Sequence, residues 1–416
     1  MKWRPGPGIC PKDNGLRKTT VPIPESSLAC PLSPRHDPGV TAPTTTPLRW
    51  GILGTGTIAE VFARDLPLSV GAKLLAVGSR SASTAEGFAA THKVPRAHGT
   101  YEDLVNDGEV DAVYVATPAH LHAEHVTLAL NAGKHVLCEK PFTLNGAQAR
   151  ELASLARSKN LFLMEAMWTR FLPAMHQLRG LLEEGAIGDI LQVHADLGLP
   201  VALDPKARIY SPELGGGSWM DLGTYAVALA HMVLGEPQSV QGAGHLVETG
   251  VDGHAAALLK YASGAVALLS SSIQSAGSQE ATIVGTRGRI HLPAPWWCPV
   301  ELHLVRLDDK PSLSGRIGRR AVGSLRSALP SSGGMARTAA GWSGSMSRWL
   351  ARRTPRPQRL RLPFSGIGLH LEASEVARCV AAGETQSPLM PLDESIAIMD
   401  TLDTVRAQMG LQFPGE

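Results

Sequence analysis

A glycine-rich stretch close to residue 50 constrains this chain more than any other feature. Residues Leu48 to Ala59 read Leu-Arg-Trp-Gly-Ile-Leu-Gly-Thr-Gly-Thr-Ile-Ala, which is typical of a strand, a tight turn and the start of a helix. Gly54 permits the turn, Gly56 lets backbone amides approach a pyrophosphate, and Ala59 is small enough for helix to pack on strand. The stretch alone is also compatible with an ordinary strand, turn and helix that bind no nucleotide. The rest of the sequence is therefore needed to distinguish the two interpretations.

Length and composition indicate a globular protein. The chain has 416 residues, enough for about two domains with cores of their own, and 44% of its residues are hydrophobic. No apolar run is long enough to span a membrane. The five cysteines include no Cys-x-x-Cys pair, so neither a disulfide framework nor a zinc cage is indicated. We therefore expect a cytoplasmic protein.

The net charge of +2 hides an uneven distribution of charge. The segment from Lys310 to His370 contains 12 Lys and Arg but no Asp or Glu, and residues 1–47 add a net charge of +3. The remainder therefore carries about 13 excess negative charges. An acidic body with two basic segments does not favour nucleic-acid binding by the chain as a whole.

Two segments are expected to lie outside the folded domains. Residues 1–47 contain ten prolines and no apolar periodicity, which predicts a disordered extension without a secretory signal. Residues 310–362 are rich in Ser, Gly, Arg and Pro, which predicts a basic, mobile insert. The alternative for the insert is an anion-binding arm for nucleic acid or membrane, with Trp342 and Trp349 as contact residues.

The second apolar run, Ala72 to Val77, bears on the choice of cofactor. It ends at Gly78-Ser79-Arg80-Ser81, where an acidic residue would hold the ribose 2′-hydroxyl of NAD. Ser79 and Arg80 instead offer donors for the 2′-phosphate of NADP. We therefore predict NADP, with NAD as the alternative if Arg80 only stacks on adenine or lies in solvent.

The apolar pattern predicts an α/β fold with two domains. Short strands alternate with helices as far as residue 166, which predicts a doubly wound parallel sheet, the Rossmann arrangement, over residues 48–166. Residues 167–416 contain short strand-like runs joined by glycine turns, which predict an α+β domain with an open, mostly antiparallel sheet. One face of that sheet is expected to pair with a second subunit, giving a homodimer.

Polar side chains gather where the predicted strands end. Thr117-Pro118 closes one strand, and Glu139-Lys140-Pro141 closes the next, at the edge where such sheets bind ligands. A surface lysine with a glutamate neighbour is the alternative interpretation of Lys140. The neighbouring histidines match no common metal site, so no metal is expected; they are His120, His122 and His125.

Two further segments carry candidate residues. Gly215-Gly-Gly-Ser-Trp-Met-Asp221-Leu-Gly-Thr-Tyr225 is typical of a flexible loop that enters a helix, and Asp221 and Tyr225, four apart, share one helical face. A dipole-stabilised carboxylate and a core tyrosine would explain both residues without any chemistry. The segment from Glu165 to Pro173 contains Trp168 and Arg170 and is too rich in aromatic and charged groups for a plain connection.

Taken together, these motifs resemble the Gfo/Idh/MocA oxidoreductase family. The resemblance covers residues 48 to the C-terminus without the basic insert, and Ala132-Gly-Lys-His-Val-Leu-Cys-Glu-Lys-Pro141 is its most specific part. Three segments are similar to the dimeric trans-dihydrodiol dehydrogenase and D-xylose dehydrogenase branch. Inositol dehydrogenases have a histidine where Tyr225 stands, so the chain departs from them. The motifs that carry the resemblance are Gly-x-Gly-x-x-Ala, Ala116-Thr-Pro118, Asp221-x-x-x-Tyr225 and His370-x-Glu-Ala, and the segments that carry the branch are 161–173, 248–252 and 297–299.

The resemblance implies an NAD(P)-dependent dehydrogenase that acts on a CH-OH group of a sugar, polyol or trans-dihydrodiol. Lys140, Tyr225 and Asp221 would be catalytic, and Trp168, Arg170 and Tyr225 would contact the substrate. In the expected mechanism Tyr225 handles the hydroxyl proton, and the Lys140 ammonium lowers the tyrosine pKa. The implied cofactor contacts are Gly54, Gly56, Thr57, Ile58, Ser79, Arg80, Thr117, Pro118, His122, Glu139 and Lys140.

One alternative function belongs to a different class. The chain could be a catalytically silent, cofactor-sensing regulator that binds nucleic acid through the basic insert. A fold alone does not separate an enzyme from such a regulator. The presence of both Lys140 and Tyr225 favours the enzyme, because a sensor needs neither.

Overall fold

The computed structural model describes residues 46–307, 357–414 and 416. Residues 1–45, which make up nearly all of the predicted disordered extension, lie outside the described part. Residues 308–356 lie outside it as well, and with them most of the predicted basic insert, including Trp342 and Trp349.

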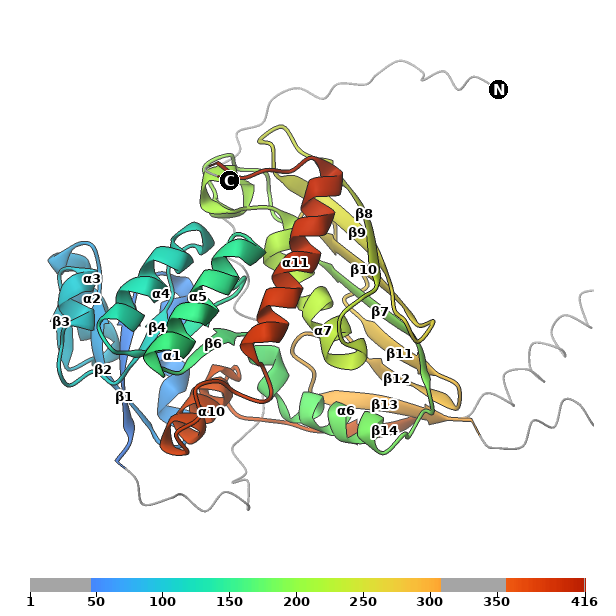
Figure 1. Ribbon diagram of the computed structural model, residues 1–416, viewed down its shortest axis with the longest axis horizontal. Helices are drawn as coiled ribbons and strands as arrows, with labels where there is room; N and C mark the ends of the chain where they lie inside the picture. Colours follow the sequence, from blue (N-terminus) through green and yellow to red (C-terminus); the bar gives the residue numbers. More distant parts are fainter. Residues whose placement is uncertain (1–45, 308–356, 415) are drawn as a thin grey trace, which may run out of the picture. The chain divides into compact units, whose positions relative to one another are not determined.

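The first sheet is parallel and contains six strands in the order β3-β2-β1-β4-β5-β6 (Figure 1). This order confirms the predicted doubly wound sheet, in which ligands bind at the carboxyl ends of the strands where the winding reverses, between β1 and β4. The strands are β1 Leu48–Leu53, β2 Ala72–Gly78, β3 Arg96–His98, β4 Ala112–Val115, β5 His135–Glu139 and β6 Leu163–Ala166. The connecting helices are α1 Thr57–Asp65, α2 Ala82–His92, α3 Tyr101–Val105, α4 His122–Asn131 and α5 Gly146–Lys159.

The second sheet has eight strands in the order β14-β13-β12-β11-β7-β10-β9-β8. Only the pair of β7 and β10 is parallel, so the sheet is mixed and mostly antiparallel, as predicted. The strands are β7 Ile190–Gly198, β8 Ser239–Leu246, β9 Asp252–Lys260, β10 Val266–Ser272, β11 Ala281–Gly285, β12 Gly288–Leu292, β13 Glu301–Arg306 and β14 Gln358–Arg361.

The last strand corrects the predicted end of the basic insert. We placed residues 358–361 inside the mobile segment, but they form β14 and pair with Glu301–Leu304 of β13. The composition of this stretch concealed the strand, because Arg side chains on an exposed edge strand leave no alternating apolar pattern.

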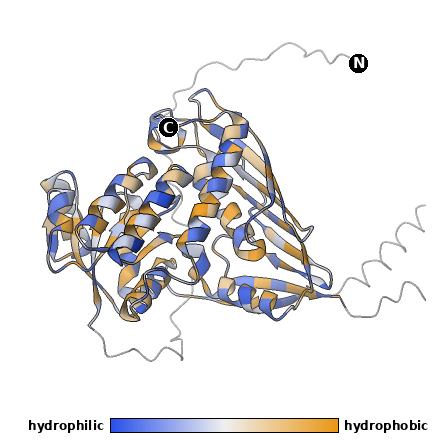
Figure 2. Cartoon of the chain, in the orientation of Figure 1, coloured by the Kyte–Doolittle hydropathy of each residue, from blue (hydrophilic) through white to orange (hydrophobic). Residues whose placement is uncertain are grey.

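Helices cover one face of the second sheet. Helices α6 Pro173–Glu183, α7 Thr224–Leu234 and α11 Leu392–Met409 contact its strands. Figure 2 shows that α7 is hydrophobic along its length, whereas α11 alternates hydrophobic and polar residues. The two helices differ because α7 is surrounded by protein, with every residue from Thr224 to His231 buried.

The last part of the chain returns to the first sheet. Helix α10 Leu369–Ala381 contacts α1 and β2, and α11 contacts α5. The buried carboxylate of Asp65 accepts hydrogen bonds from the backbone N–H groups of Ile367, Gly368 and His370 and lies 2.9 Å from His370 Nδ1. Burial alone would raise the pKa of Asp65, but these bonds outweigh it and lower the pKa. The His370 motif therefore fastens the C-terminal helices to the first helix of the chain.

Among the helices in the described ranges, none combines the length and the apolar character that crossing a membrane requires.

Candidate active site

The glycine turn after β1 has the geometry that a pyrophosphate site needs. Gly54 has φ +113°, and a Cβ atom there would lie 3.0 Å from the carbonyl oxygen of Ala116. Around Gly56 no described atom lies within 4 Å of the Cβ position, so the space beside the helix start is open. The first turn of α1 has no side-chain cap, which leaves backbone N–H groups at Thr57 and Ile58 available for a phosphate. These residues fit a dinucleotide.

The loop after β2 lies directly beside this turn. The backbone N–H of Gly54 donates to the carbonyl oxygen of Gly78 at 3.0 Å, and the next residues are Ser79, which is buried, and Arg80, which is exposed. Burial raises the pKa of Tyr101, and the neighbouring Arg80 guanidinium opposes that rise. Arg80 is thus an available cation at the carboxyl end of the strand where the cofactor ribose is expected.

In the segment after β4, the ring of His122 lies against backbone groups. Thr117 and Pro118 lie at the carboxyl end of the strand, as predicted, but the ring of His122 is 1% exposed. Its two nitrogens lie 2.8 Å from the carbonyl oxygen of Thr117 and 2.9 Å from that of Pro141. Burial lowers the pKa of His122 to about 4, so the neutral ring has one N–H, which can donate to only one of the two carbonyl oxygens at a time. Both ring nitrogens thus face protein groups, and a contact of His122 with the cofactor stays a prediction.

Glu139 likewise bonds to groups within the protein. Its side chain is 5% exposed and accepts hydrogen bonds from the Tyr114 hydroxyl and, at 3.1 Å, from the backbone N–H of Lys140. Burial raises the pKa of Glu139, while Tyr114 and Lys140 oppose the shift. The carboxyl group therefore supports the backbone of Lys140, and its contact with a cofactor stays a prediction.

Lys140 is the centre of the site. Its ammonium donates to the carbonyl oxygen of Asp221 at 3.0 Å, lies 3.6 Å from Asp221 Oδ1, and lies 4.7 Å from the centre of the Tyr225 ring. Burial would lower the pKa of Lys140, but the opposing effects, of which the negative charge of Asp221 is the largest, outweigh burial and raise it. The lysine is therefore a permanent cation. The structure thus brings together all three residues that we predicted to be catalytic, although 81 positions separate Lys140 from Asp221.

The helix that carries Asp221 and Tyr225 begins with a wide turn that the sequence did not reveal. Trp219–Gly223 is a π-helix, and α7 follows from Thr224. Such turns insert one extra residue into a helix and are frequent at functional sites. Burial would raise the pKa of Asp221, but Lys140 and Arg208 outweigh it and lower the pKa to about 2. Asp221 is therefore ionised.

Tyr225 and Trp168 form the wall of the site. Both side chains are 8% exposed, and Trp168 Nε1 donates to the Tyr225 hydroxyl at 3.0 Å. Burial raises the pKa of Tyr225, and Lys140 opposes the rise without reversing it. We predicted a lowered pKa, because the sequence showed the ammonium but not the loss of water around the phenol. At neutral pH the hydroxyl is protonated and suited to donate a proton.

Arg170 is not part of this wall. Its side chain is buried, donates to the carbonyl oxygens of Ala228 at 2.7 Å and Leu389 at 3.3 Å, and pairs with Glu394. These partners occupy Arg170 within the protein, and its contact with a substrate stays a prediction. The guanidinium joins α7 to α11, and the spacing from Trp168 could not show in which direction it points.

Arg208 is the site residue that sequence reasoning missed. It lies in a short 3-10 helix, Arg208–Tyr210, and its Nη2 donates to Asp221 Oδ1 at 2.9 Å. No motif or periodicity singles it out in the loop between β7 and the π-helix. Within the described ranges, no group of three or more His, Cys, Asp and Glu residues is arranged to hold a metal ion.

The sequence of the chain is similar to those of known oxidoreductases. Residues 48–167 match the family model GFO/IDH/MocA, described as an oxidoreductase family with an NAD-binding Rossmann fold, and residues 175–291 match the GFO/IDH/MocA C-terminal domain. The chain is 34% identical to trans-1,2-dihydrobenzene-1,2-diol dehydrogenase of Xenopus laevis over 88% of its own length and 99% of that protein. It is 35% identical to the Homo sapiens enzyme of the same name, covering 88% and 98% of the two chains.

Solved structures with a similar fold also include oxidoreductases. One is KijD10, a 3-ketoreductase from Actinomadura kijaniata in complex with TDP-benzene and NADP, with 25% identity, a TM-score of 0.66, and 87% and 98% of the two chains covered. An aldose-aldose oxidoreductase from Caulobacter crescentus, complexed with glycerol, has the same fold at 20% identity, with a TM-score of 0.69 and coverage of 87% and 97%.

Proposed function

The chain belongs to the GFO/IDH/MocA family of NAD(P)-binding oxidoreductases, and from this we propose that it is an NADP-dependent dehydrogenase acting on a carbinol carbon of a sugar, polyol or trans-dihydrodiol. The observation that carries the proposal is the convergence of Lys140, Asp221 and Tyr225 at the carboxyl edge of the first sheet. Bound NADP would supply or accept the hydride at C4 of its nicotinamide ring.

The protein side chains would manage the proton and the substrate oxygen. Tyr225 donates its hydroxyl proton to the oxygen of a carbonyl that is being reduced, and takes the proton from the alcohol in the reverse direction. Lys140 stabilises negative charge on either oxygen, because it stays protonated beside the phenol. Trp168 orients the phenol through its N–H group and gives the ring of a substrate an apolar wall.

A panel of substrates tests this proposal. D-Xylose, a second aldose and a trans-dihydrodiol are incubated with NADP or NAD, and reduced cofactor is followed at 340 nm. Turnover of at least one compound is expected. Absence of turnover on every compound, in both directions and with both cofactors, would contradict the proposed activity and favour the silent regulator.

We expect Arg80→Asp to abolish the preference for NADP. A guanidinium binds a phosphate dianion with charge-assisted hydrogen bonds, so the change should raise the Kd of NADP by about 10- to 100-fold. The Kd of NAD, which has no 2′-phosphate, should change much less. The Kd values can be measured by titration of intrinsic tryptophan fluorescence.

Arg64→Asp is the matched control for Arg80→Asp. Arg64 is exposed in the last turn of α1, at the end of the helix away from the glycine turn, and its change should leave the cofactor preference intact. Equal affinity of the unmutated protein for NAD and NADP would refute the role of Arg80.

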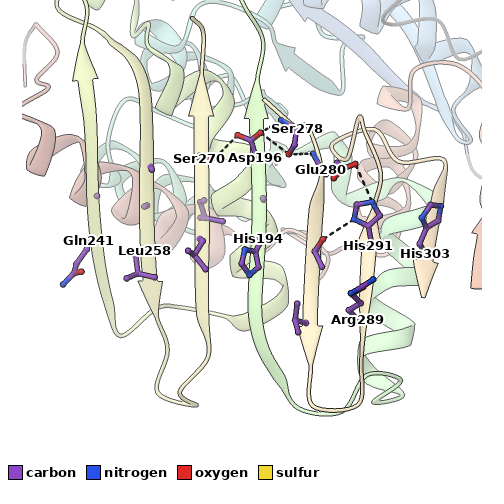
Figure 3. A pocket seen from close by; sticks show the side chains of 18 of the residues that line it. His194, Asp196, Gln241, Leu258, Ser270, Ser278, Glu280, Arg289, His291 and His303 are labelled. Atoms are coloured by element: carbon purple, nitrogen blue, oxygen red, sulfur yellow. Dashed lines mark hydrogen bonds and ion pairs between the residues drawn. The ribbon is translucent and has the colours of Figure 1, made fainter. Parts of the chain in front are cut away.

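We further propose that a second copy of the chain covers the open face of the second sheet. Outward-facing side chains of this sheet line the broad depression in Figure 3, with Leu258, His194 and His291 on three different strands. Leu268 lies on the interior strand β10 and is 44% exposed, which is unusual for a leucine on a strand that has a neighbour on each side. Burial against an identical face would remove these apolar groups from water.

Leu268→Glu should therefore shift the protein from dimer to monomer, because the interface would have to bury an unpaired carboxylate. Light scattering after size-exclusion chromatography measures the mass directly. Leu68→Glu is the matched control, since Leu68 is 49% exposed but lies next to α1. A monomeric unmutated protein at micromolar concentration would rule out this interface.

A further inference from the structure

A second cation stands beside Lys140 and shares its carboxylate partner. Asp221 Oδ1 lies 2.9 Å from Arg208 Nη2 and 3.6 Å from Lys140 Nζ. One partly exposed carboxylate oxygen therefore lies between two positive groups, one of which also lies over the Tyr225 ring. Any substrate oxygen close to Asp221 would meet an acceptor and two donors.

The loop that carries Arg208 is fastened to the start of the catalytic helix. The backbone N–H of Gly217 donates to the carbonyl oxygen of Ile209 at 2.8 Å, and the Tyr210 hydroxyl donates to that of Val201 at 2.7 Å. A Cβ atom at Gly216 would lie 2.6 Å from the carbonyl oxygen of Arg208. The triple glycine, which we interpreted as a flexible loop, therefore allows two backbone segments to pack closely. The position of Arg208 relative to Asp221 is fixed by this packing.

The guanidinium of Arg208 retains unused donors. Within the described part of the chain its one hydrogen bond is to Asp221, although a guanidinium carries five N–H groups. Its side chain is 41% exposed, whereas that of Arg170, which bonds two carbonyl oxygens and pairs with Glu394, is 3% exposed. Arg208 can therefore donate to a bound molecule without giving up Asp221. Because a hydroxyl group both accepts and donates, it can bond to the guanidinium and to the Asp221 carboxylate together.

We propose that Arg208 determines substrate specificity by binding, together with Asp221, the hydroxyl group on the carbon next to the reacting carbinol. This inference rests on the proposed function, in which Tyr225 handles the reacting oxygen. Asp221 lies four residues before Tyr225, so the two oxygens of a vicinal diol would meet neighbouring groups of one segment. Arg208 donates to the second oxygen and Asp221 accepts its hydrogen. The pair therefore selects vicinal diols and sugars over simple alcohols.

A comparison of a diol with the matching monoalcohol tests the inference. The substrates are trans-cyclohexane-1,2-diol and cyclohexanol, or a sugar that the protein oxidises and its deoxy analogue, with NADP. Arg208→Gln should lower kcat/KM for the diol by about 10- to 100-fold, mostly through KM, because a charge-assisted hydrogen bond is lost. Its effect on the monoalcohol should be several-fold smaller. Arg208→Lys keeps the positive charge but loses the planar arrangement of N–H donors, so it should give an intermediate loss of kcat/KM for the diol.

Arg49→Gln is the matched control. Arg49 also pairs with an aspartate, Asp111, at 2.7 Å, and its side chain is about as exposed as that of Arg208. It lies at the amino end of β1, away from the candidate site. Equal losses on diol and monoalcohol in both Arg208 variants would overturn the inference and leave Arg208 as a support for Asp221. Absence of turnover on all substrates by the unmutated protein would instead refute the proposed function and, with it, this inference.

Discussion

Tyr225→Phe is expected to lose kcat by roughly 100-fold or more while the Kd of NADP stays near that of the unmutated protein. The variant lacks the hydroxyl that moves the proton, and it leaves the N–H of Trp168 without its acceptor. The Kd should persist because the glycine turn and Arg80 lie on other elements. Single-turnover kinetics at 340 nm separates the chemical step from cofactor binding.

Tyr261→Phe is the matched control for this change. Tyr261 is 5% exposed, and its hydroxyl has no hydrogen-bond partner among the described residues, so removal of the hydroxyl should leave turnover unchanged. Near-normal turnover of Tyr225→Phe would move the proton transfer to another group. Lys140 is one candidate. The other is the half-buried His120, whose Nδ1 has no partner in the part of the chain that the structure describes.

The raised pKa of Tyr225 also predicts how the rate of reduction depends on pH. Because burial raises the pKa of this phenol above its ordinary value, the proton donor persists through neutral and mildly alkaline pH. Carbonyl reduction should therefore lose rate only as the pH rises into the strongly alkaline range. A loss of kcat centred close to neutral pH in the reductive direction would indicate a different proton donor.

Lys140→Met should reduce kcat/KM by about 1000-fold, a larger effect than any other single change we propose. The variant removes the cation that lies over the Tyr225 ring and leaves Asp221 with Arg208 as its partner. The phenol then loses the charge that opposes its rise in pKa, and the developing alkoxide loses its nearest positive group. Steady-state kinetics with the preferred substrate measures the loss.

Two further variants make the Lys140 prediction specific. Lys140→Arg keeps a positive charge but replaces a compact ammonium with a planar fork, so it should recover only part of the activity. Lys73→Met alters an exposed lysine close to the amino end of β2 and should leave kcat/KM unchanged. Retention of more than about a tenth of the activity by Lys140→Met would show that the ammonium does not stabilise the transition state.

The sequence identified the lysine and the tyrosine that meet at the candidate site, but not the direction in which several neighbouring side chains point. Lys140 and Tyr225 were identified by family motifs, and the structure places Lys140 Nζ 4.7 Å from the centre of the tyrosine ring. Glu139 belongs to the same motif as Lys140, and His122 follows the Ala116-Thr-Pro118 motif, yet their side chains turn inward to backbone groups and to Tyr114. A motif fixes the identity and the strand of a residue, but not the direction of its side chain.

The sequence by itself determined the order of the strands and helices around the glycine turn, because that information is local. Apolar runs, glycine spacing and the ends of strands are set by steric limits and periodicity within a few residues. The same apolar pattern, followed along the whole chain, also predicted the doubly wound sheet and the open, mostly antiparallel sheet that follows it. Both were confirmed, apart from the strand β14 that basic residues concealed.

Tertiary structure alone decided which side chains meet at the candidate site and in which direction their pKa values shift. The pairing of Arg208 with Asp221, the close packing of the triple glycine and the engagement of Arg170 with α7 and α11 each join segments that no sequence spacing relates. The pKa of Tyr225 is the clearest case, because its direction depends on whether the loss of water or the Lys140 charge is larger. Both terms arise only when distant segments pack around the phenol, since burial and Coulomb energy depend on distances in space and not along the chain.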